Sequence, residues 1–107
     1  MNYKPFLLLV ISFVLLGCGK NVLNVRVSTS RGPYAYTEII MDGSTFAKKY
    51  GGFTETYDSP QAGKYWLNCY DYDDNAKDYI FIGQSNAVEV EDPPLFSTKN
   101  YDLYYSF

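Results

Sequence analysis

The sequence predicts an all-β protein, specifically a small antiparallel β-sandwich of seven or eight short strands. Apolar and polar residues alternate with a period of two in several segments, the pattern of strands with one buried face. Turn-forming residues recur roughly every 8–12 residues, as in sandwiches and small barrels. Aromatic residues make up 19% of the chain and include 12 tyrosines, which favours strands, where aromatic rings pack across neighbours.

The alternation is clearest in the middle of the chain, at residues 64–72. There Tyr65, Leu67 and Cys69 would face one side of the strand, while even-numbered residues face the other. No segment carries an apolar stripe of helical period. Residues 46–50 fit either a strand or a helical turn. The expected strands are residues 23–27, 34–41, 53–57, 64–72, 79–82, 87–91 and 100–107.

The N-terminus has the layout of a secretory signal peptide. Lys4 precedes an apolar run, residues 6–16, which ends in small residues. This run is much shorter than the roughly 20 residues that a helix needs to cross a bilayer. The segment Leu15-Leu16-Gly17-Cys18 resembles the bacterial lipobox, in which the leader is cut before a lipid-modified cysteine.

The lipobox resemblance implies that Cys18 carries a diacylglycerol and usually an amide-linked acyl chain such as palmitate. Each buried methylene contributes about 0.8 kcal/mol, so two or three chains anchor durably. Gly19 stands where Asp would signal retention in the inner membrane of Gram-negative bacteria. The resemblance therefore implies a lipid-anchored protein of the cell envelope, on the outer membrane of such a host, facing the periplasm or the cell surface.

Removal of the leader leaves about 90 residues, enough for one small domain. We expect a cleaved signal peptide at residues 1–17, the lipidated cysteine and a short tether at residues 18–24, and a β-sandwich at residues 25–107. The tether contains no Pro/Ser-rich linker, so the domain should lie close to the membrane.

One motif links the expected sandwich to known surface domains. Pro60-Gln-Ala-Gly63-Lys-Tyr65 opens the best strand and resembles the Pro-x-Gly-x-Tyr motif of transthyretin-like and PEGA-type sandwiches, which have Ig-like two-sheet architectures. Such domains occur in bacterial surface proteins and in lipoproteins of secretion machines. These lipoproteins are a structural precedent for a binding or accessory module, but this chain is too short for their extra helix and loops, so the resemblance does not assign their role to it.

Composition argues against several classes of function. The net charge is −3 and arginine occurs only at Arg26 and Arg31, so no basic stripe is available for nucleic acid. The chain has no histidine, which excludes a histidine base or metal ligand. It also lacks a Gly-x-Ser-x-Gly elbow and a Gly-rich phosphate loop. We therefore expect a protein that is not an enzyme and needs no cofactor, with calcium as the one open question.

Cys69 has no partner for an internal disulfide if Cys18 is lipidated, because the chain has two cysteines. Its position in the expected strand at residues 64–72 favours a buried small hydrophobe. An exposed, reactive thiol is the alternative.

The one acidic cluster, residues 71–78, offers oxygen ligands at alternate positions, as a Ca²⁺ loop does. An EF-hand is disfavoured, because Ala76 replaces its glycine and Ile82 its bidentate glutamate. The cluster with Ile82-Gly83 also resembles the third calcium loop of C2 domains, and Gly32-Pro-Tyr34 faintly resembles the segment bearing their first, although Gly32 stands where that family has an aspartate. A solvated hairpin is the simpler interpretation. The ligands of the calcium hypothesis would be Asp71, Asp73, Asn75 and Asp78.

The remaining candidate is an aromatic surface made by Trp66, Tyr70 and Tyr72 on one side of the central strand, with Tyr36 and Tyr104 beside it. Exposed aromatic rings bring large contact area at low entropic cost, which suits a protein-docking face. The alternative is that both sides of this strand are buried.

These observations predict a membrane-anchored, non-catalytic module that binds another envelope or surface protein. A calcium-dependent, C2-like surface or lipid-binding domain is the first alternative. A periplasmic inhibitor of a hydrolase is the second.

Overall fold

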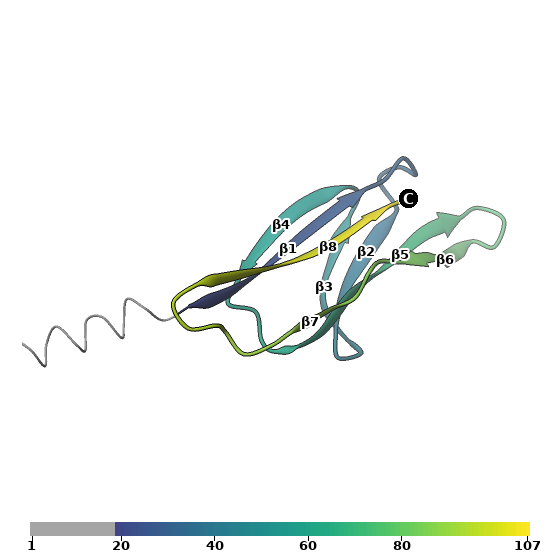
Figure 1. Ribbon diagram of the computed structural model, residues 1–107. Helices are drawn as coiled ribbons and strands as arrows, with labels where there is room; N and C mark the ends of the chain where they lie inside the picture. Colours follow the sequence, from purple (N-terminus) through teal and green to yellow (C-terminus); the bar gives the residue numbers. More distant parts are fainter. Residues whose placement is uncertain (1–18) are drawn as a thin grey trace, which may run out of the picture.

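The computed structural model describes residues 19–107, which fold into two packed β-sheets (Figure 1). The expectations for the signal peptide and for Cys18 fall on residues 1–18 and lie outside the described residues. The first sheet has the strand order β4-β1-β8, and the second has the order β3-β2-β5-β6 with β7 paired to β5. The strands are β1 (Lys20–Ser28), β2 (Tyr36–Met41), β3 (Ser44–Tyr50), β4 (Phe53–Asp58), β5 (Gly63–Asp73), β6 (Asp78–Gln84), β7 (Val88–Val90) and β8 (Thr98–Ser106).

This architecture confirms the all-β, two-sheet fold expected from the alternation. Residues 19–107 contain eight strands and no helix. Accordingly, nothing in this part of the chain is a helix with the length and apolarity to traverse a bilayer. The segment at residues 46–50, which fitted a strand or a helical turn, belongs to β3.

The core lies between the inner faces of the two sheets. Leu23 and Val25 of β1 and Leu67 of β5 are fully buried, as the period-two pattern predicts. Face-to-face packing of the two sheets removes the apolar side chains of their inner faces from water, which is the main stabilising contribution to the fold. The buried core cluster comprises Leu23, Val25, Val27, Ile39, Tyr65, Leu67, Val90, Tyr101 and Leu103.

The pairing of the first and last strands differs from the expected antiparallel pattern. β8 lies parallel to β1, with Leu23 opposite Tyr101 and Val25 opposite Leu103, whereas the other strand pairs are antiparallel. Side-chain alternation fixes which residues face the core but not the direction of a neighbouring strand. The parallel pair therefore could not be read from the alternation.

The fold begins earlier than the expected tether allows. β1 starts at Lys20, so residues 20–24, expected as tether, belong to the sheet. Val22 and Leu23 are buried there. The Asn21 side chain is also buried and donates a hydrogen bond to the Glu91 carbonyl at 2.6 Å.

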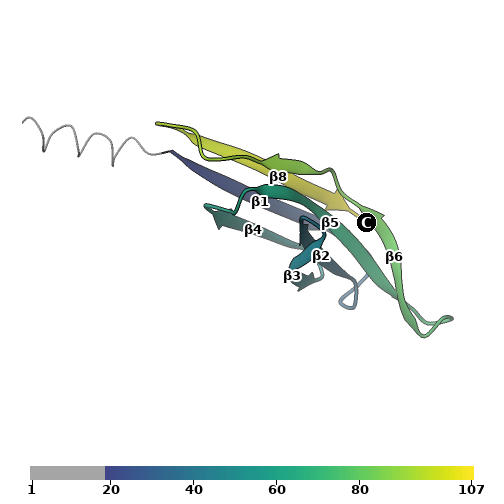
Figure 2. The same cartoon turned by 90° about the horizontal axis from the view of Figure 1, so that it is seen from below.

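The two ends of the sandwich carry different loops. β1 and β8 run the same way, so the C-terminus lies at the opposite end from Gly19 (Figure 1). The β5–β6 hairpin extends past the sandwich at this far end, as Figure 2 also shows. At about 3.3 Å per residue, the nine residues of β1 separate the two ends by about 30 Å.

Candidate functional site

A row of aromatic rings crosses the outer face of the larger sheet. Tyr36 of β2 is the register partner of both Tyr50 of β3 and Tyr70 of β5, and Tyr70 is in turn paired with Phe81 of β6. Directly opposed residues point to the same side of a sheet, so these four rings form one line across four strands. We call these residues, together with Tyr72 and Tyr79, the aromatic row.

The rings of the aromatic row contact one another. Tyr36 stacks on Tyr70 with 4.9 Å between ring centroids, and the edge of Tyr79 meets Tyr36 at the same distance. Tyr70 also meets Phe81 edge-on at 5.6 Å. Such pairs are worth about 0.5–1.5 kcal/mol each beyond the area they bury. The rings therefore hold one another in place before any partner arrives.

Lys48 adds a positive charge to one side of the aromatic row. Its ammonium nitrogen lies 4.1 Å from the centroid of the Tyr36 ring and 5.2 Å from that of Tyr50. A hydrogen bond with Tyr50 raises the pKa of Lys48 further above its ordinary value of 10.5. Burial raises the pKa of the Tyr36 phenol, while the nearby Lys48 opposes that rise.

Exposure differs along the aromatic row. Tyr36 at its centre is buried, whereas Tyr50 is 55% exposed, Phe81 56% and Tyr72 40%. The row thus has a shielded centre and accessible flanks. This is the arrangement of a rigid surface that can make contact with little further loss of side-chain freedom.

The three residues expected to form the surface lie on the same side of β5. Tyr70 and Tyr72 belong to the aromatic row, whereas Trp66 lies nearer the other end of β5, half-buried, with the Lys64 ammonium 5.9 Å from its ring centroid. Tyr36 lies beside Tyr70, as expected, and is at the centre of the row. Tyr104 is not beside it, because it lies on β8 in the other sheet, where it is 66% exposed.

Sequence reasoning missed Tyr50, Tyr79, Phe81 and Lys48. These residues lie on β3 and β6, and only the strand register brings them beside β2 and β5. The one signal in the sequence was that the aromatic residues among them occur in segments where apolar and polar residues alternate.

The acidic cluster lies at the β5–β6 hairpin, as expected for residues 71–78. Three of its carboxylates accept hydrogen bonds from nearby backbone amides: Asp71 from Tyr72, Asp73 from Asn75, and Asp78 from Tyr79. The Asp73–Asn75 bond is the local contact typical of an Asx-turn, which stabilises the hairpin loop. Asn75 itself is exposed.

The carboxylate of Asp71 already forms an ion pair with an arginine side chain of the protein. Arg31, from the β1–β2 loop, places a guanidinium nitrogen 3.5 Å from an Asp71 carboxylate oxygen. The same two residues line a shallow hollow with Tyr34 and Asp74. Within residues 19–107, no three acidic or thiol side chains converge as ligands of a metal ion would. The positive charge of Arg31 would repel a calcium ion there.

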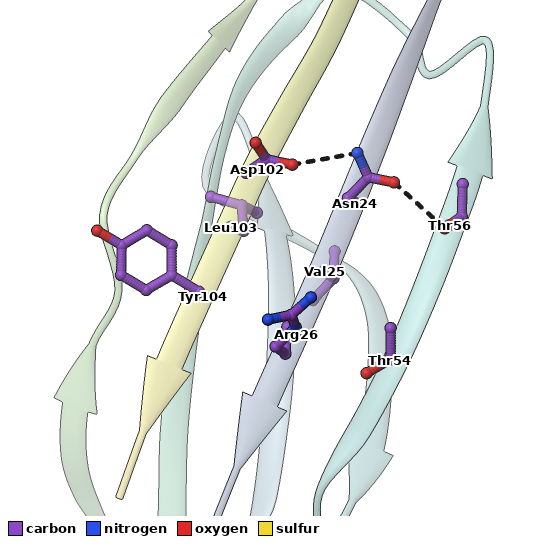
Figure 3. Close-up of a pocket in the computed structure, with 8 residues that line it drawn as sticks. All are labelled: Asn24, Val25, Arg26, Thr54, Thr56, Asp102, Leu103 and Tyr104. Atoms are coloured by element: carbon purple, nitrogen blue, oxygen red, sulfur yellow. Dashed lines mark hydrogen bonds between the residues drawn. The ribbon is translucent and has the colours of Figure 1, made fainter.

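A second hollow, of about 540 Å³, lies on the outer face of the smaller sheet (Figure 3). The Asn24 amide donates to Asp102 at 3.1 Å and accepts from the Thr56 hydroxyl at 3.2 Å. Some of the polar groups that line the hollow are therefore already hydrogen-bonded to one another. The residues around it come from β1, β4 and β8, which only the fold brings together, so the hollow was not expected. The lining residues are Asn24, Val25, Arg26, Thr54, Thr56, Asp102, Leu103 and Tyr104.

Cys69 is fully buried on the inner face of β5, which confirms the expected small hydrophobe. Its sulfur lies 3.3 Å from the Thr37 hydroxyl oxygen. Burial raises the pKa of the Cys69 thiol, and the contact with Thr37 offsets only part of that rise. A buried, protonated thiol is a poor nucleophile.

No protein-family model matches this chain, and no curated protein matches it.

Proposed function

We propose that this protein is a lipid-anchored lipoprotein of the bacterial envelope that uses the aromatic row to bind another envelope protein, without catalysing a reaction. The observation that carries the proposal is the line of contacting rings across four strands, with exposed flanks at Tyr50, Phe81 and Tyr72. Aromatic residues, tyrosine among them, are enriched at protein interfaces.

The position of the aromatic row supports this role. Tyr36 begins β2 and Tyr70 lies near the end of β5, which places the row in the half of the sandwich far from Gly19 (Figure 1). If Cys18 is lipidated, the row stands away from the membrane surface. A partner in the aqueous space or in a neighbouring machine could then reach it.

The lipid anchor is supported by the lipobox and by the start of the domain. β1 starts at Lys20, two residues after Cys18 in the sequence, so a lipid on Cys18 would be attached at the end of the sandwich. The two-sheet architecture is also compatible with the transthyretin-like and PEGA-type resemblance. Intact mass spectrometry of the protein from a bacterial membrane should show the loss of residues 1–17 and the mass of a lipid on Cys18.

The C2-like alternative fits the geometry less well. In that alternative the β5–β6 hairpin would touch a membrane, yet the hairpin lies at the opposite end from Gly19 (Figure 2). A chain anchored at Cys18 could not bring that hairpin to the same bilayer without tilting through a large angle. The Arg31–Asp71 ion pair is a second argument against a calcium site there.

Site-specific cross-linking tests the docking role of the aromatic row. A photoreactive phenylalanine analogue is placed at Tyr50 or at Phe81, which lie on opposite edges of the row, and at Tyr104 as a matched exposed control on the other sheet. We expect the same protein partner to be captured from positions 50 and 81 in living cells, but not from position 104. Equal capture from all three positions, or none from 50 and 81, would contradict the proposal.

A further inference from the structure

A short apolar loop projects from the end of the domain at which the described chain begins. It connects β7 to β8 and contains Pro93-Pro94-Leu95-Phe96, which we call the proline loop (Figure 1). Leu95 is 75% exposed, the highest value among the large hydrophobic residues of 19–107, and Phe96 is 60% exposed. These two adjacent apolar side chains forgo the stabilisation that burial would give them.

The C-terminal end of the proline loop is fixed against the start of β1. The backbone N–H of Lys20 donates to the Ser97 carbonyl at 3.1 Å. Gly19 lies so close to the carbonyl oxygens of Pro94 and Ser97 that an added Cβ would overlap both. The loop and the first described residue therefore form one rigid corner of the domain.

The other end of the proline loop is fixed as well. The Asn21 amide donates to the Glu91 carbonyl at 2.6 Å, and the Glu91 N–H donates to the Tyr101 hydroxyl at 3.3 Å. With both ends held, Leu95 and Phe96 are presented in a defined place rather than on a freely moving segment.

The backbone of Phe96 indicates that its ring is kept there against a local preference. Its φ angle is +66°, a left-handed conformation that glycine and asparagine adopt easily and bulky residues rarely do. Residues held in such conformations store strain and cluster at sites with a function.

From these observations we propose that the proline loop inserts Leu95 and Phe96 into the interfacial region of the membrane to which Cys18 anchors the chain. This inference rests on the proposed lipid anchor. Gly19 follows Cys18, and consecutive Cα atoms are about 3.8 Å apart, so the lipid and the loop would meet the same bilayer at the same corner. Aromatic and aliphatic side chains at that depth leave water, which stabilises the contact.

Charges around the proline loop indicate an apolar rather than an electrostatic contact. Glu91 and Asp92 precede the loop, and Lys99 follows it. Lys20 is paired with Asp58, with 3.4 Å between nitrogen and oxygen. These charges give no cationic excess toward anionic lipid, so membrane contact should depend little on salt.

Together, the lipid and the loop would provide two points of contact and hold the sandwich upright. A single lipid attachment leaves a domain free to tilt and rotate, whereas a second contact at the same corner restricts both motions. The β5–β6 hairpin would then lie at the end of the sandwich away from the membrane (Figures 1 and 2), and the aromatic row would lie on the side of the larger sheet in the half nearer that end.

The test uses the full chain, produced with its leader in bacteria, purified as the lipidated protein and reconstituted into phosphatidylethanolamine–phosphatidylglycerol vesicles. An environment-sensitive fluorophore is attached to Leu95→Cys, or to Ala76→Cys in the exposed hairpin loop at the far end as the matched control. Cys69 stays unlabelled because it is buried. We expect a blue shift at position 95 and quenching by lipids that carry a nitroxide near the headgroup, with neither effect at position 76.

The outcomes separate the two proposals. If mass spectrometry shows the lipid on Cys18 and the probe at position 95 behaves like the probe at position 76, the proline loop does not insert and this inference is wrong. If the protein carries no lipid, the anchor itself is wrong, and the role of the loop fails with it. A blue shift at position 95 that 0.5 M salt abolishes would also contradict an apolar insertion.

Discussion

The rings of Tyr36 and Tyr70 lie nearly parallel, with 4.9 Å between their centroids and 21° between their planes. Tyr36 is buried although it points to the outer side of its sheet, because Lys48 and its aromatic neighbours cover it. The outer face of the larger sheet therefore contains a small second cluster of packed side chains. Its centre supports the fold, and its flanks are available for contact.

This difference between centre and flank can be measured by substitution. Tyr36→Ala removes a buried ring and should lower the free energy of unfolding by about 2–4 kcal/mol. Phe81→Ser removes a ring that is 56% exposed and should change it by less than about 1 kcal/mol. Urea unfolding of both variants gives the comparison. If Phe81→Ser is as destabilising as Tyr36→Ala, the flank is structural and does not form a separate docking surface.

A tyrosine of the opposite sheet leaves no room for a side chain at a glycine of β6. The Tyr105 ring of β8 lies directly over Gly83, and a Cβ at that position would overlap the Tyr105 hydroxyl and ring. Gly83→Ala should therefore destabilise the domain by about 1–3 kcal/mol through overpacking. Chemical denaturation measures this loss.

The double variant Gly83→Ala, Tyr105→Leu tests the cause. The smaller leucine leaves room for the alanine methyl, so the double variant should lose less stability than the sum of the two single variants, by about 0.5–3 kcal/mol. Additive losses would show that the two residues do not interact. The contact with Tyr105 explains why position 83 is a glycine. The resemblance to a C2 calcium loop had instead grouped Gly83 with Ile82 as part of such a loop.

Burial of Cys69 makes the stability depend on pH in the alkaline range. The folded protein raises the thiol pKa above its ordinary value of 9.0, so the unfolded chain loses this proton first. The resulting stabilisation is complete below about pH 9 and is lost as the pH rises toward the folded pKa. Burial also raises the pKa of Tyr57 and Tyr65 above 10.0, which steepens the loss at higher pH.

Urea midpoints measured from neutral pH to about pH 10 should therefore fall as the pH rises above about 9. In Cys69→Ala the midpoint should be lower at neutral pH, because a buried side chain is shortened, and the fall just above pH 9 should be smaller. The tyrosine contribution at higher pH should remain. An identical pH profile for the two proteins would show that the thiol ionises as easily in the fold as in the unfolded chain.

The sequence predicted the strands well because burial on one face leaves a local trace. The inward positions of β1, β5 and β8 follow from alternation alone, as Leu23, Leu67 and Leu103 show. The sequence predicted the pairing of strands and the start of β1 poorly. The parallel β1–β8 pair, and with it the start of β1 at Lys20, depends on residues far apart in the chain. Isolated local patterns carry no information on such contacts.

The same distinction applies to the candidate site. Tyr70 and Tyr72 could be assigned to one side of their strand from the period of two, but the remaining rings of the aromatic row come from other strands. The predicted position of Tyr104 beside the row was wrong for this reason, since its strand, β8, belongs to the other sheet. The proline loop falls between the expected strands at residues 87–91 and 100–107, and only the fold brings it against Gly19.

The last prediction concerns the acidic hairpin. A ligand at a hundred times its Kd stabilises a folded protein by about 2.7 kcal/mol, which thermal unfolding detects readily. We expect millimolar calcium to leave the unfolding temperature unchanged, because Arg31 already neutralises Asp71, and Asp73 and Asp78 accept backbone hydrogen bonds.

Magnesium at the same concentration controls for ionic strength, and Asp102→Asn controls for the loss of an unrelated exposed carboxylate. A calcium-specific rise in the unfolding temperature that Asp73→Asn abolishes and Asp102→Asn retains would contradict this prediction. It would mean that carboxylates of the hairpin bind calcium although the Arg31 guanidinium lies 3.5 Å from Asp71. The hairpin would then be a calcium-dependent contact surface at the opposite end of the sandwich from the start of β1.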